Sequence, residues 1–498
     1  MRGFDERLGS GSLVRGPELE RLSPLLATFE PLRRILDLED EGPELLSERL
    51  AGSAYPLWPQ VRFQFAAAMT ANAFGSVTVP QVPDSGAFRR KLLRSVLPNR
   101  WDGARFGAPR DLVYVTSGVT TYAEHSRERN WLVEGFLADF PDRSVLMQWR
   151  DVPSPNGPPA FPDTRTLGPM LLRASISARL RRDRARVHAS AVTLVRRLAR
   201  LLGDDIDEST LAQIADREAN RELARPRVER EFSRLLQRTR AKVLVIEDAC
   251  YGSHASLVTL AKSRGVLVVE PQHGWIGSSH PAYNFGGAMS APEFSRLLPD
   301  ALLTFGDFWG HHLRFPGQIV PIGKPHLDLL AVGAPPVSDR PREVLVVSSV
   351  SHPNSTDRFA VRLRRLLPPG WTVRFRPHPS ERGMVSSRYP ELTAEEGVVI
   401  DAEEDVYRSL ARVRVVVGVE STVLFEALKF DCAVFVRESA TTPYYLGSIL
   451  GDPLPDETGP VQIAKRLDEY RQRARVSVDS IWRPRAQDNF KHWFESLR

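Results

Sequence analysis

The chain repeats one hydrophobic pattern: a short apolar run ends in polar residues, and a segment with one apolar face and helical spacing follows. The apolar run Val243–Ile246 ends in Glu247 and Asp248. A helical segment comes next, and a second apolar run, Val266–Val269, leads into a polar stretch that contains His273. A strand, a helix and a strand joined by short turns form a βαβ unit with parallel strands.

Both strands of this unit end in residues with useful chemistry. Ligands of open parallel sheets bind outside the carboxyl ends of the strands. The carboxylates of Glu247 and Asp248 and the imidazole of His273 are therefore predicted to lie at the binding edge of the sheet. We expect the rest of the chain to bring a second half-site against this edge.

The same pattern recurs on both sides of a proline-rich segment, Ala331–Arg342, which is predicted to be a linker. The other strand-like runs before it are Asp111–Thr116, Ser144–Trp149, Ala301–Phe305 and Ile319–Ile322. Those after it are Glu343–Val347, Trp371–Arg376, Val398–Ile400, Val413–Val417 and Ala433–Val436, with helical segments at Arg358–Leu367, Asp405–Ala411 and Ser421–Leu428. Two α/β halves joined by a hinge are predicted.

The expected domain boundaries follow from this pattern. We predict a helical N-terminal region over residues 1–110 and a first Rossmann-like domain over 111–333, with a helical insertion over roughly 170–240. A second Rossmann-like domain over 343–484 and a final helix over 485–498 complete the chain. The proline-rich stretch Asp151–Pro169 is expected to be an exposed loop or lid.

Length and composition place the chain among ordinary soluble proteins. With 498 residues it exceeds the size of a single core, and 42% hydrophobic and 26% charged residues are typical of globular domains. The sequence contains neither a long apolar run of membrane-spanning length nor a signal peptide, and Cys250 and Cys432 are expected to be reduced core residues. A cytoplasmic protein is predicted.

The net charge of +6 comes mostly from arginine, and Ala178–Arg200 alone contains eight arginines. A solvated helix face is one interpretation of this cluster. Attraction to anionic lipid, on the inner face of the membrane, or to an anionic polymer is the alternative. Because zinc spacing, aromatic RNA-binding motifs and a recognition helix are absent beside it, nucleic acid is not an expected partner.

The second half contains candidates for binding an anion. Ser421 and Thr422 stand where a strand passes into a helix, whose first N–H groups can bind a phosphate, and Glu426 lies one turn further for a ribose. The alternative is that Ser421 or Thr422 only caps the helix. His378 is held between two prolines after a strand that ends in Arg376, which suits a phosphate contact or a proton transfer.

Taken in order, these motifs resemble a known group of enzymes. Glu-Asp, Gln-His-Gly, Gly-Lys-Pro-His-Leu-Asp, Arg-Pro-His-Pro and Glu-Ser-Thr are similar to motifs of GT-B-fold bacterial glycosyltransferases of surface-polysaccharide synthesis. Within this group, the motifs resemble those of capsule and polysialyltransferase-like enzymes and of CDP-glycerol polymerases. The resemblance covers Lys242–Val436 and implies two Rossmann-like domains that face each other across a cleft, with the acceptor on the first and the donor nucleotide on the second. It also implies that the final helix packs back on the first domain.

The resemblance implies roles for particular residues. His378-Pro379 and Ser421-Thr422 match donor-phosphate motifs, and Arg376, Glu426 and the turn residues Ser348 and Ser349 would complete the donor site. Glu247-Asp248 is similar to the acidic motif that supplies a general base, with Ala249 in place of a glycine. His273 matches the competing His-Gly motif, and the choice between these bases stays open. Lys324 and Asp328 would face the cleft or form a structural turn.

The expected activity is inverting, metal-independent transfer from a CMP-, CDP-, UDP- or GDP-linked sugar to a glycan or lipid-linked acceptor, in capsule or lipopolysaccharide synthesis. An Asp-x-Asp motif at a strand end is absent, and we expect neither a metal nor another cofactor. The alternatives are a UDP-N-acetylglucosamine 2-epimerase-like enzyme, a CDP-glycerol-type polyol-phosphate transferase and an inactive envelope-assembly scaffold. An epimerase would turn over its substrate without an acceptor, and a scaffold would bind a donor without turnover.

Overall fold

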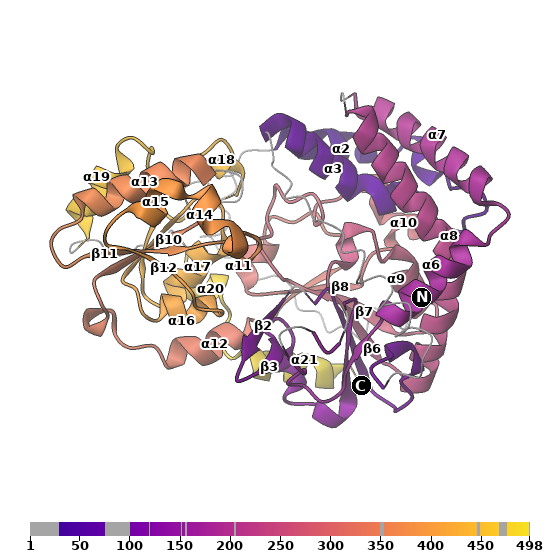
Figure 1. Cartoon of the computed structure of the whole chain (residues 1–498). Coiled ribbons are helices and arrows are strands. Elements are labelled where there is room, and N and C mark those ends of the chain that lie inside the picture. Colours follow the sequence, from indigo (N-terminus) through magenta and orange to yellow (C-terminus); the bar gives the residue numbers. More distant parts are fainter. Residues whose placement is uncertain are drawn as a thin grey trace.

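The computed structural model describes residues 29–74, 100–118, 120–150, 152–154, 157–203, 206–348, 353–445, 449–467 and 476–497. Two α/β lobes lie side by side (Figure 1). Each is built on a parallel sheet, so the predicted pair of Rossmann-like domains is confirmed. Ser349 lies outside the described residues.

The first sheet has the order β5-β4-β1-β6-β7-β8-β9 within the described residues. The strands β1, β4, β6 and β7 are buried throughout, as continuous apolar runs in a covered parallel sheet should be. Tyr114 of β1 pairs with Leu146 on one side and Val245 on the other. The strands are β1 (Leu112–Thr116), β4 (Ser144–Gln148), β5 (Thr164–Thr166), β6 (Val243–Ile246), β7 (Leu267–Pro271), β8 (Ala301–Thr304) and β9 (Gln318–Pro321).

Two short elements were not predicted. The edge strand β5 lies inside the proline-rich stretch that was expected to be a loop, and it pairs with β4 through Leu146 and Thr164. An antiparallel hairpin, β2 (Thr121–Glu124) and β3 (Arg127–Asn130), follows β1. Both are brief and polar, so they lack the apolar run by which a buried strand is recognised.

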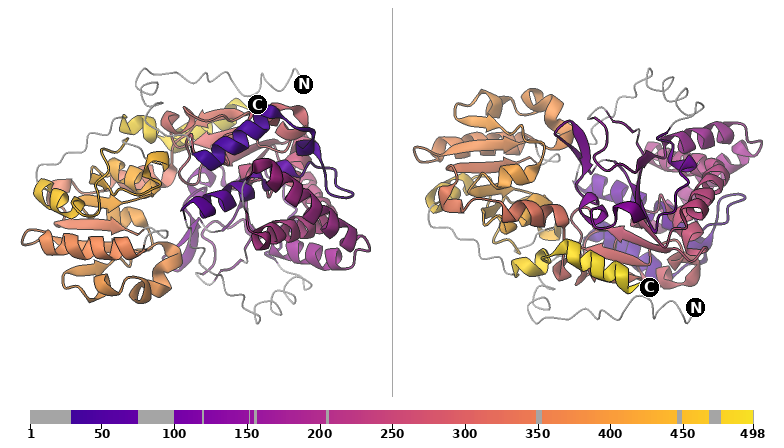
Figure 2. Two further views of the ribbon diagram at one scale, coloured as in Figure 1. Left: turned by 90° about the horizontal axis from the view of Figure 1, so that it is seen from above. Right: turned by 90° about the horizontal axis from the view of Figure 1, so that it is seen from below.

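Helices cover both faces of this sheet and form the N-terminal and inserted regions (Figures 1 and 2). The insertion is helical as predicted: α6, α7 and α8 pack together, and Phe232 and Leu236 of α8 belong to the same buried hydrophobic cluster as the sheet residue Leu244. The helices of this lobe are α2 (Glu30–Glu41), α3 (Trp58–Phe74), α5 (Glu134–Leu137), α6 (Gly168–Arg179), α7 (Arg184–Leu202), α8 (Glu208–Thr239), α9 (Ala255–Lys262), α10 (Pro292–Ser295), α11 (Asp307–Gly310) and α12 (Pro325–Val332).

The second sheet has the order β12-β11-β10-β13-β14 within the described residues. Its strands are β10 (Glu343–Val347), β11 (Thr372–Arg376), β12 (Val398–Ile400), β13 (Val415–Gly418) and β14 (Ala433–Val436). The helices beside it and after it are α13 (Pro353–Leu366), α14 (Val385–Arg388), α15 (Pro390–Ala394), α16 (Val406–Leu410), α17 (Thr422–Lys429), α18 (Thr442–Tyr445), α19 (Gly459–Arg466), α20 (Val478–Ile481) and α21 (Ala486–Ser496). None of the helices in the described part of the chain is long and apolar enough to span a bilayer.

Short 3-10 turns connect several of these elements. They are η3 (Glu44–Ser47), η4 (Gly103–Arg105), η5 (Pro141–Arg143), η6 (Ala249–Tyr251), η7 (Gly287–Ser290), η8 (Val337–Asp339) and η9 (Pro379–Met384).

An aromatic cluster joins the two lobes. The indole N–H of Trp309 in α11 donates to the carbonyl of Ile481 (2.8 Å), and that of Trp482 donates to the carbonyl of Phe425 in α17 (2.8 Å). The chain then returns to the first lobe, where Phe490 of α21 packs on Phe136 of α5 with 4.6 Å between ring centroids. Figure 2 shows α21 against the underside of this lobe. Buried aromatic rings therefore fix the lobes to each other.

The carboxyl edges of the two sheets face each other. Glu124, in the hairpin after β1, forms an ion pair with Arg408 of α16 (3.1 Å). His326, after β9, contacts Asp405, after β12, with 2.7 Å between Nε2 and Oδ2. Both contacts join segments that follow strand ends in one sheet to segments that follow strand ends in the other. This orientation directs the two ligand-binding edges to a common region.

Candidate active site

The candidate site lies where the strand order of the first sheet reverses. The chain passes from β1 outward through β4 and β5 and returns to β6 on the other side of β1. Loops diverge at such a switch point, and the carboxyl ends of the flanking strands bind ligands. The segments that follow β1 and β6 begin with Ser117 and Glu247, so the structure brings them together.

Glu247 is held firmly in place. Its Oε2 accepts hydrogen bonds from the backbone N–H of Ser117 (2.7 Å), the hydroxyl of Ser117 (3.0 Å) and the hydroxyl of Thr120 (3.4 Å). Burial and the neighbouring charge of Asp248 raise the pKa of Glu247 to about 7, against the lowering effect of these donors. A buried carboxyl that titrates near neutrality at a switch point is typical of active sites.

Asp248 and His273 form a pair at the same edge. The Oδ1 of Asp248 lies 3.1 Å from Nε2 of His273, and their side chains are 33% and 18% exposed. Asp248 has a left-handed backbone (φ 63°), a conformation that aspartate and asparagine tolerate better than most residues. Burial raises the pKa of Asp248 and lowers the pKa of His273, so the pair can hold one proton between them.

Sequence reasoning missed a second buried carboxyl, Glu270 in β7. Its two oxygens accept hydrogen bonds from the hydroxyl of Tyr283 (2.7 Å) and the backbone N–H of Cys250 (2.7 Å). Burial raises the pKa of Glu270 to about 8, and its Oε1 lies 3.9 Å from Nδ1 of His273. The sequence signal that could have identified Glu270 was a carboxyl inside an apolar strand, three residues before His273.

The N-terminal helices support this cluster from outside the sheet. The guanidinium of Arg62 in α3 is buried, pairs with Glu39 of α2 (2.7 Å) and donates to the carbonyl of Asn284 (2.7 Å). Phe63 packs on Tyr251 with 4.1 Å between ring centroids. The segment that carries Tyr283 is thus anchored to α2 and α3.

The second lobe presents the predicted donor residues at adjacent strand ends. The backbone N–H of His378, after β11, donates to the hydroxyl of Ser348, after β10 (2.8 Å). The Nδ1 of His378 accepts the backbone N–H of Ser380 (3.2 Å), so a neutral His378 carries its proton on Nε2. The exposed imidazole can therefore donate a hydrogen bond to a ligand oxygen, and Pro379 begins η9 beside it.

Other predicted donor residues have structural contacts as well. The hydroxyl of Ser421 caps α17 by accepting the N–H of Val423 (3.2 Å), which agrees with the capping interpretation. Thr422 occupies the first turn of the same helix and is partly exposed. The guanidinium of Arg376 is buried and bonds to Asp401 (2.6 Å), so in this conformation it positions the loop after β12.

Lys324 and Glu426 come together at the junction of the lobes. The ammonium of Lys324 lies 2.5 Å from Oε1 of Glu426, which also accepts the hydroxyl of Tyr407 (2.9 Å). Both side chains are buried, and the Lys324 ammonium lies 4.4 Å from the ring centroid of Trp131. Asp328, its companion in the sequence motif, accepts the N–H of Ala486 (2.9 Å), which is a structural contact. The expected contact of Glu426 with a ribose stays a prediction.

In the described residues, no group of three or more His, Cys, Asp or Glu side chains is placed so that it could bind a metal ion. The chemistry that the site offers is proton transfer by carboxyl and imidazole groups at one edge. Hydrogen-bond donors for an anion lie at the opposing edge.

Comparisons with known proteins give structural similarity alone. No protein-family model matches the chain, and no curated protein sequence matches it. A UDP-GlcNAc 2-epimerase from Methanocaldococcus jannaschii is 9% identical over 77% of this chain and 99% of its own, with a TM-score of 0.44. MnaA of S. aureus, solved with UDP, is 10% identical over 78% of this chain and 98% of its own (TM-score 0.43).

A transferase is also among the similar structures. The lipopolysaccharide outer core galactosyltransferase WaaB is 12% identical over 78% of this chain and 99% of its own, with a TM-score of 0.38. Similarity at this level identifies neither a reaction nor the role of any residue.

Proposed function

We propose that the protein transfers a sugar from a nucleotide donor to a hydroxyl of a surface glycan or lipid-linked acceptor, with inversion and without a metal. The observation that carries this proposal is the pair Asp248–His273, with Glu247 and Glu270 beside it, at an edge that faces hydrogen-bond donors of the second lobe. The sequence motifs described above add the nucleotide-sugar class. A role in capsule or lipopolysaccharide synthesis belongs to the same proposal.

Within this proposal, Asp248 is the general base. Glu247 is 3% exposed and its Oε2 accepts up to three hydrogen bonds, whereas the Asp248 side chain is one-third exposed and is paired with an imidazole. The proton of the acceptor hydroxyl passes to Asp248, while the acceptor oxygen forms a bond to the anomeric carbon. The bond from that carbon to the phosphate oxygen breaks, and its electron pair leaves with the nucleotide. Attack opposite the leaving group inverts the anomeric centre.

The second lobe would stabilise the leaving phosphate. The Nε2–H of His378, after β11, and the hydroxyl of Thr422, after β13, are donors at the ends of the two strands that flank β10. These groups increase their interaction with the oxygen as charge develops on it, so they favour the transition state over the bound donor.

A thermal-shift panel of CMP, CDP, UDP and GDP tests the donor site. One nucleotide is expected to raise the melting temperature by mass action; a concentration one hundred times the Kd adds about 2.7 kcal/mol of stability. The shift should be reduced in His378→Ala, which keeps its fold because the side chain is exposed. His188→Ala, which removes a half-buried imidazole of α7 that contacts Asp216 (3.2 Å), is the control and should respond like the wild type. A folded protein that responds to none of the four nucleotides would contradict the proposed transferase.

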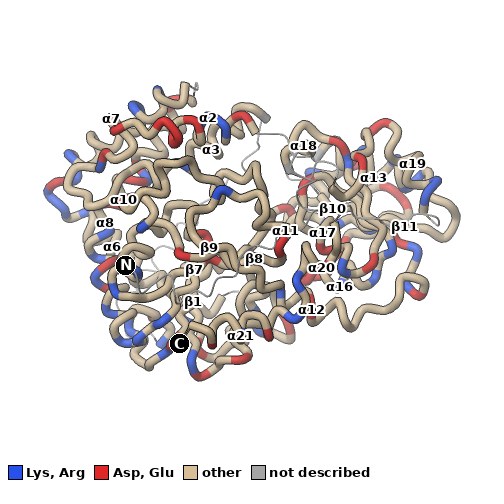
Figure 3. Tube along the Cα trace, turned by 180° about the vertical axis from the view of Figure 1, so that it is seen from behind, with Lys and Arg blue, Asp and Glu red and all other residues tan. Residues whose placement is uncertain are grey.

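We also propose that the first lobe touches anionic lipid through the corner between α6 and α7. Leu180 is 80% exposed there, and the exposed Arg179, Arg182 and Arg184 form no ion pair with any residue in the described ranges. Basic positions recur along α6–α8, at the end of this lobe away from the second one (Figure 3). An exposed leucine among unpaired arginines suits the headgroup boundary of an anionic membrane.

Vesicle sedimentation tests this contact. Binding to vesicles that contain 30% phosphatidylglycerol should exceed binding to pure phosphatidylcholine. The triple change R179E/R182E/R184E should abolish the difference, since each arginine contributes about 1 kcal/mol near such a surface. Arg196→Glu and Arg197→Glu remove arginines that pair with Glu208 and Glu48, and serve as the matched control. Equal binding to both vesicle types would refute the contact.

A further inference from the structure

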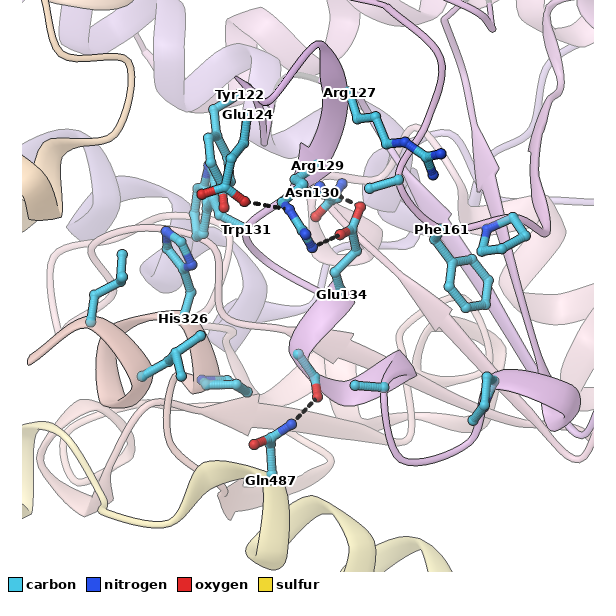
Figure 4. Close-up of a pocket in the computed structure, with 18 residues that line it drawn as sticks. Tyr122, Glu124, Arg127, Arg129, Asn130, Trp131, Glu134, Phe161, His326 and Gln487 are labelled. Atoms are coloured by element: carbon cyan, nitrogen blue, oxygen red, sulfur yellow. Dashed lines mark hydrogen bonds and ion pairs between the residues drawn. The ribbon is translucent and has the colours of Figure 1, made fainter. Parts of the chain in front are cut away.

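A cavity of about 480 Å³ lies beside the candidate site, in the first lobe. The hairpin β2–β3, the segment through α5, the loop around Phe161, α12 and Gln487 of α21 form its walls (Figure 4). Its size is within the range of small-molecule and cofactor sites in proteins.

Aromatic rings form part of the lining. Tyr122, Trp131 and Phe161 are all half-buried and line the cavity, and Leu329 of α12, which is 73% exposed, adds a further apolar surface. Flat apolar faces at the wall of an open pocket suit a ligand that has an apolar face of its own. Pyranose rings have such faces, formed by their axial C–H groups, and carry hydroxyl groups around the edge.

Polar groups of two kinds surround these rings. Arg129 lies between Glu124 (2.6 Å) and Glu134 (3.4 Å), and burial raises the pKa of Glu134 to about 7. Arg127 also lines the cavity, is exposed, and forms no hydrogen bond or ion pair through its side chain with any residue that the structure describes. Figure 4 shows its guanidinium on the Phe161 side, apart from the Arg129 cluster. The cavity thus offers hydrogen-bonding groups for hydroxyls and an unpaired cation for an acid.

The cavity is connected to the candidate base cluster. The side-chain amide of Asn130, another lining residue, donates to the hydroxyl of Thr120 (3.1 Å), which in turn donates to Glu247 (3.4 Å). On another wall, His326 contacts Asp405 of the second lobe. A ligand in the cavity would therefore lie next to both the reacting edge and the junction of the lobes.

We propose that this cavity binds an acidic stretch of carbohydrate chain, as the part of the acceptor that lies away from the reacting hydroxyl. The aromatic rings pack on the sugar faces, and Arg127 binds a carboxylate of the chain. This inference rests on the proposed transfer to a glycan acceptor. It adds that the acceptor is acidic and that the cavity is where the protein binds it.

Fluorescence of Trp131 reports on this binding without any donor. The probes are oligosaccharides of galacturonic acid and of sialic acid, with maltohexaose as the neutral comparison. We expect the acidic probes to bind and to change the tryptophan emission, and maltohexaose to bind at least tenfold more weakly. Arg127→Ala should weaken acidic binding by about 10- to 100-fold, the usual effect of losing one charge-assisted hydrogen bond. Arg200→Ala, the loss of an exposed arginine on α7, should change nothing.

Three outcomes would overturn the inference: no binding of the acidic probes by the folded protein, binding that Arg127→Ala leaves unchanged, or preference for maltohexaose. Nucleotide stabilisation is measured on the same variant and should stay at the wild-type value. If the wild type binds the acidic glycans but is not stabilised by any nucleotide, the proposed transfer reaction is rejected and the glycan site is retained. A change of Trp131 emission with nucleotides, abolished in Trp131→Phe, would assign the cavity to the nucleotide instead.

Discussion

Replacing Asp248 by asparagine is expected to lower the rate of sugar transfer by about 10²- to 10⁴-fold, the usual contribution of a general base. Asparagine keeps the shape of the side chain and tolerates the left-handed backbone at this position, so the fold should be retained. The amide cannot accept the proton of the acceptor hydroxyl. The measurement is nucleotide release from the donor class that the thermal-shift panel selects, in the presence of acidic oligosaccharide acceptors.

Nucleotide binding provides the control for this variant. Asp248→Asn should show the wild-type thermal shift, because the donor residues belong to the other lobe. Full transfer activity in the variant would exclude Asp248 as the base and direct attention to Glu247. Donor turnover that proceeds equally well without any acceptor would favour an epimerase, for which the two carboxyls Glu247 and Glu270 offer a proton donor and a proton acceptor.

The pH profile of the same reaction follows from the environment of the pair. A base must be unprotonated, so kcat/KM rises as the pH passes the pKa of Asp248 in the free enzyme. Burial raises this pKa above its ordinary value near 3.8, while the charge of His273 lowers it. Removing the imidazole in His273→Ala takes away the lowering effect. The acid limb of the profile should therefore move to higher pH in this variant.

Replacing Lys324 by methionine is expected to reduce the free energy of unfolding by about 3–5 kcal/mol, the usual cost of breaking a buried ion pair. The lysine is 6% exposed, and its ammonium lies between Glu426 and aromatic rings of both lobes. Methionine has a similar length and fills the same space. The carboxylate of Glu426 would then stay buried without its counter-ion, and it would keep the hydrogen bond from the Tyr407 hydroxyl. Urea-induced unfolding measures the change.

Two further variants separate the ion pair from packing. The double variant K324M/E426Q removes the unpaired charge and should recover most of the stability, since an apolar or neutral replacement of a buried pair is often tolerated. Arg196→Ala breaks a surface pair with Glu208, whose side chains are 49% and 70% exposed, and should cost less than about 1 kcal/mol. Equal stability of K324M and the wild type would contradict this prediction. It would mean that the Glu426 carboxylate is solvated or bonds to another hydrogen-bond donor in the variant.

The local pattern of the sequence predicted most of the fold. The buried strands β1, β4, β6, β8 and β10 lie where the apolar runs predicted them, because a strand covered on both faces needs such a run wherever it occurs. The same pattern marked the polar residues that follow each strand. Asp248 and His273 were therefore predicted to lie at the same edge of the sheet, and in the structure their side chains are 3.1 Å apart.

Other parts of the site could not be predicted in this way. Glu270 lies inside an apolar strand, and only the folded environment, with Tyr283 brought against it, shows that its carboxyl is buried and weakly acidic. Lys324 and Glu426 were both noted as candidates, but they stand 102 positions apart and their pairing depends on how the lobes dock. The cavity beside Trp131 is formed by several separate segments and has no motif.

The sequence by itself determined the α/β class, the division into two halves and the chemical groups at the strand ends. These features depend on hydrophobic periodicity and turn residues, which act over a few positions of the chain. The tertiary structure alone decided which carboxyl groups are buried, which charges are paired and where a cavity remains. Desolvation and Coulomb interactions act between groups that are close in space, and strand order and lobe docking set those distances.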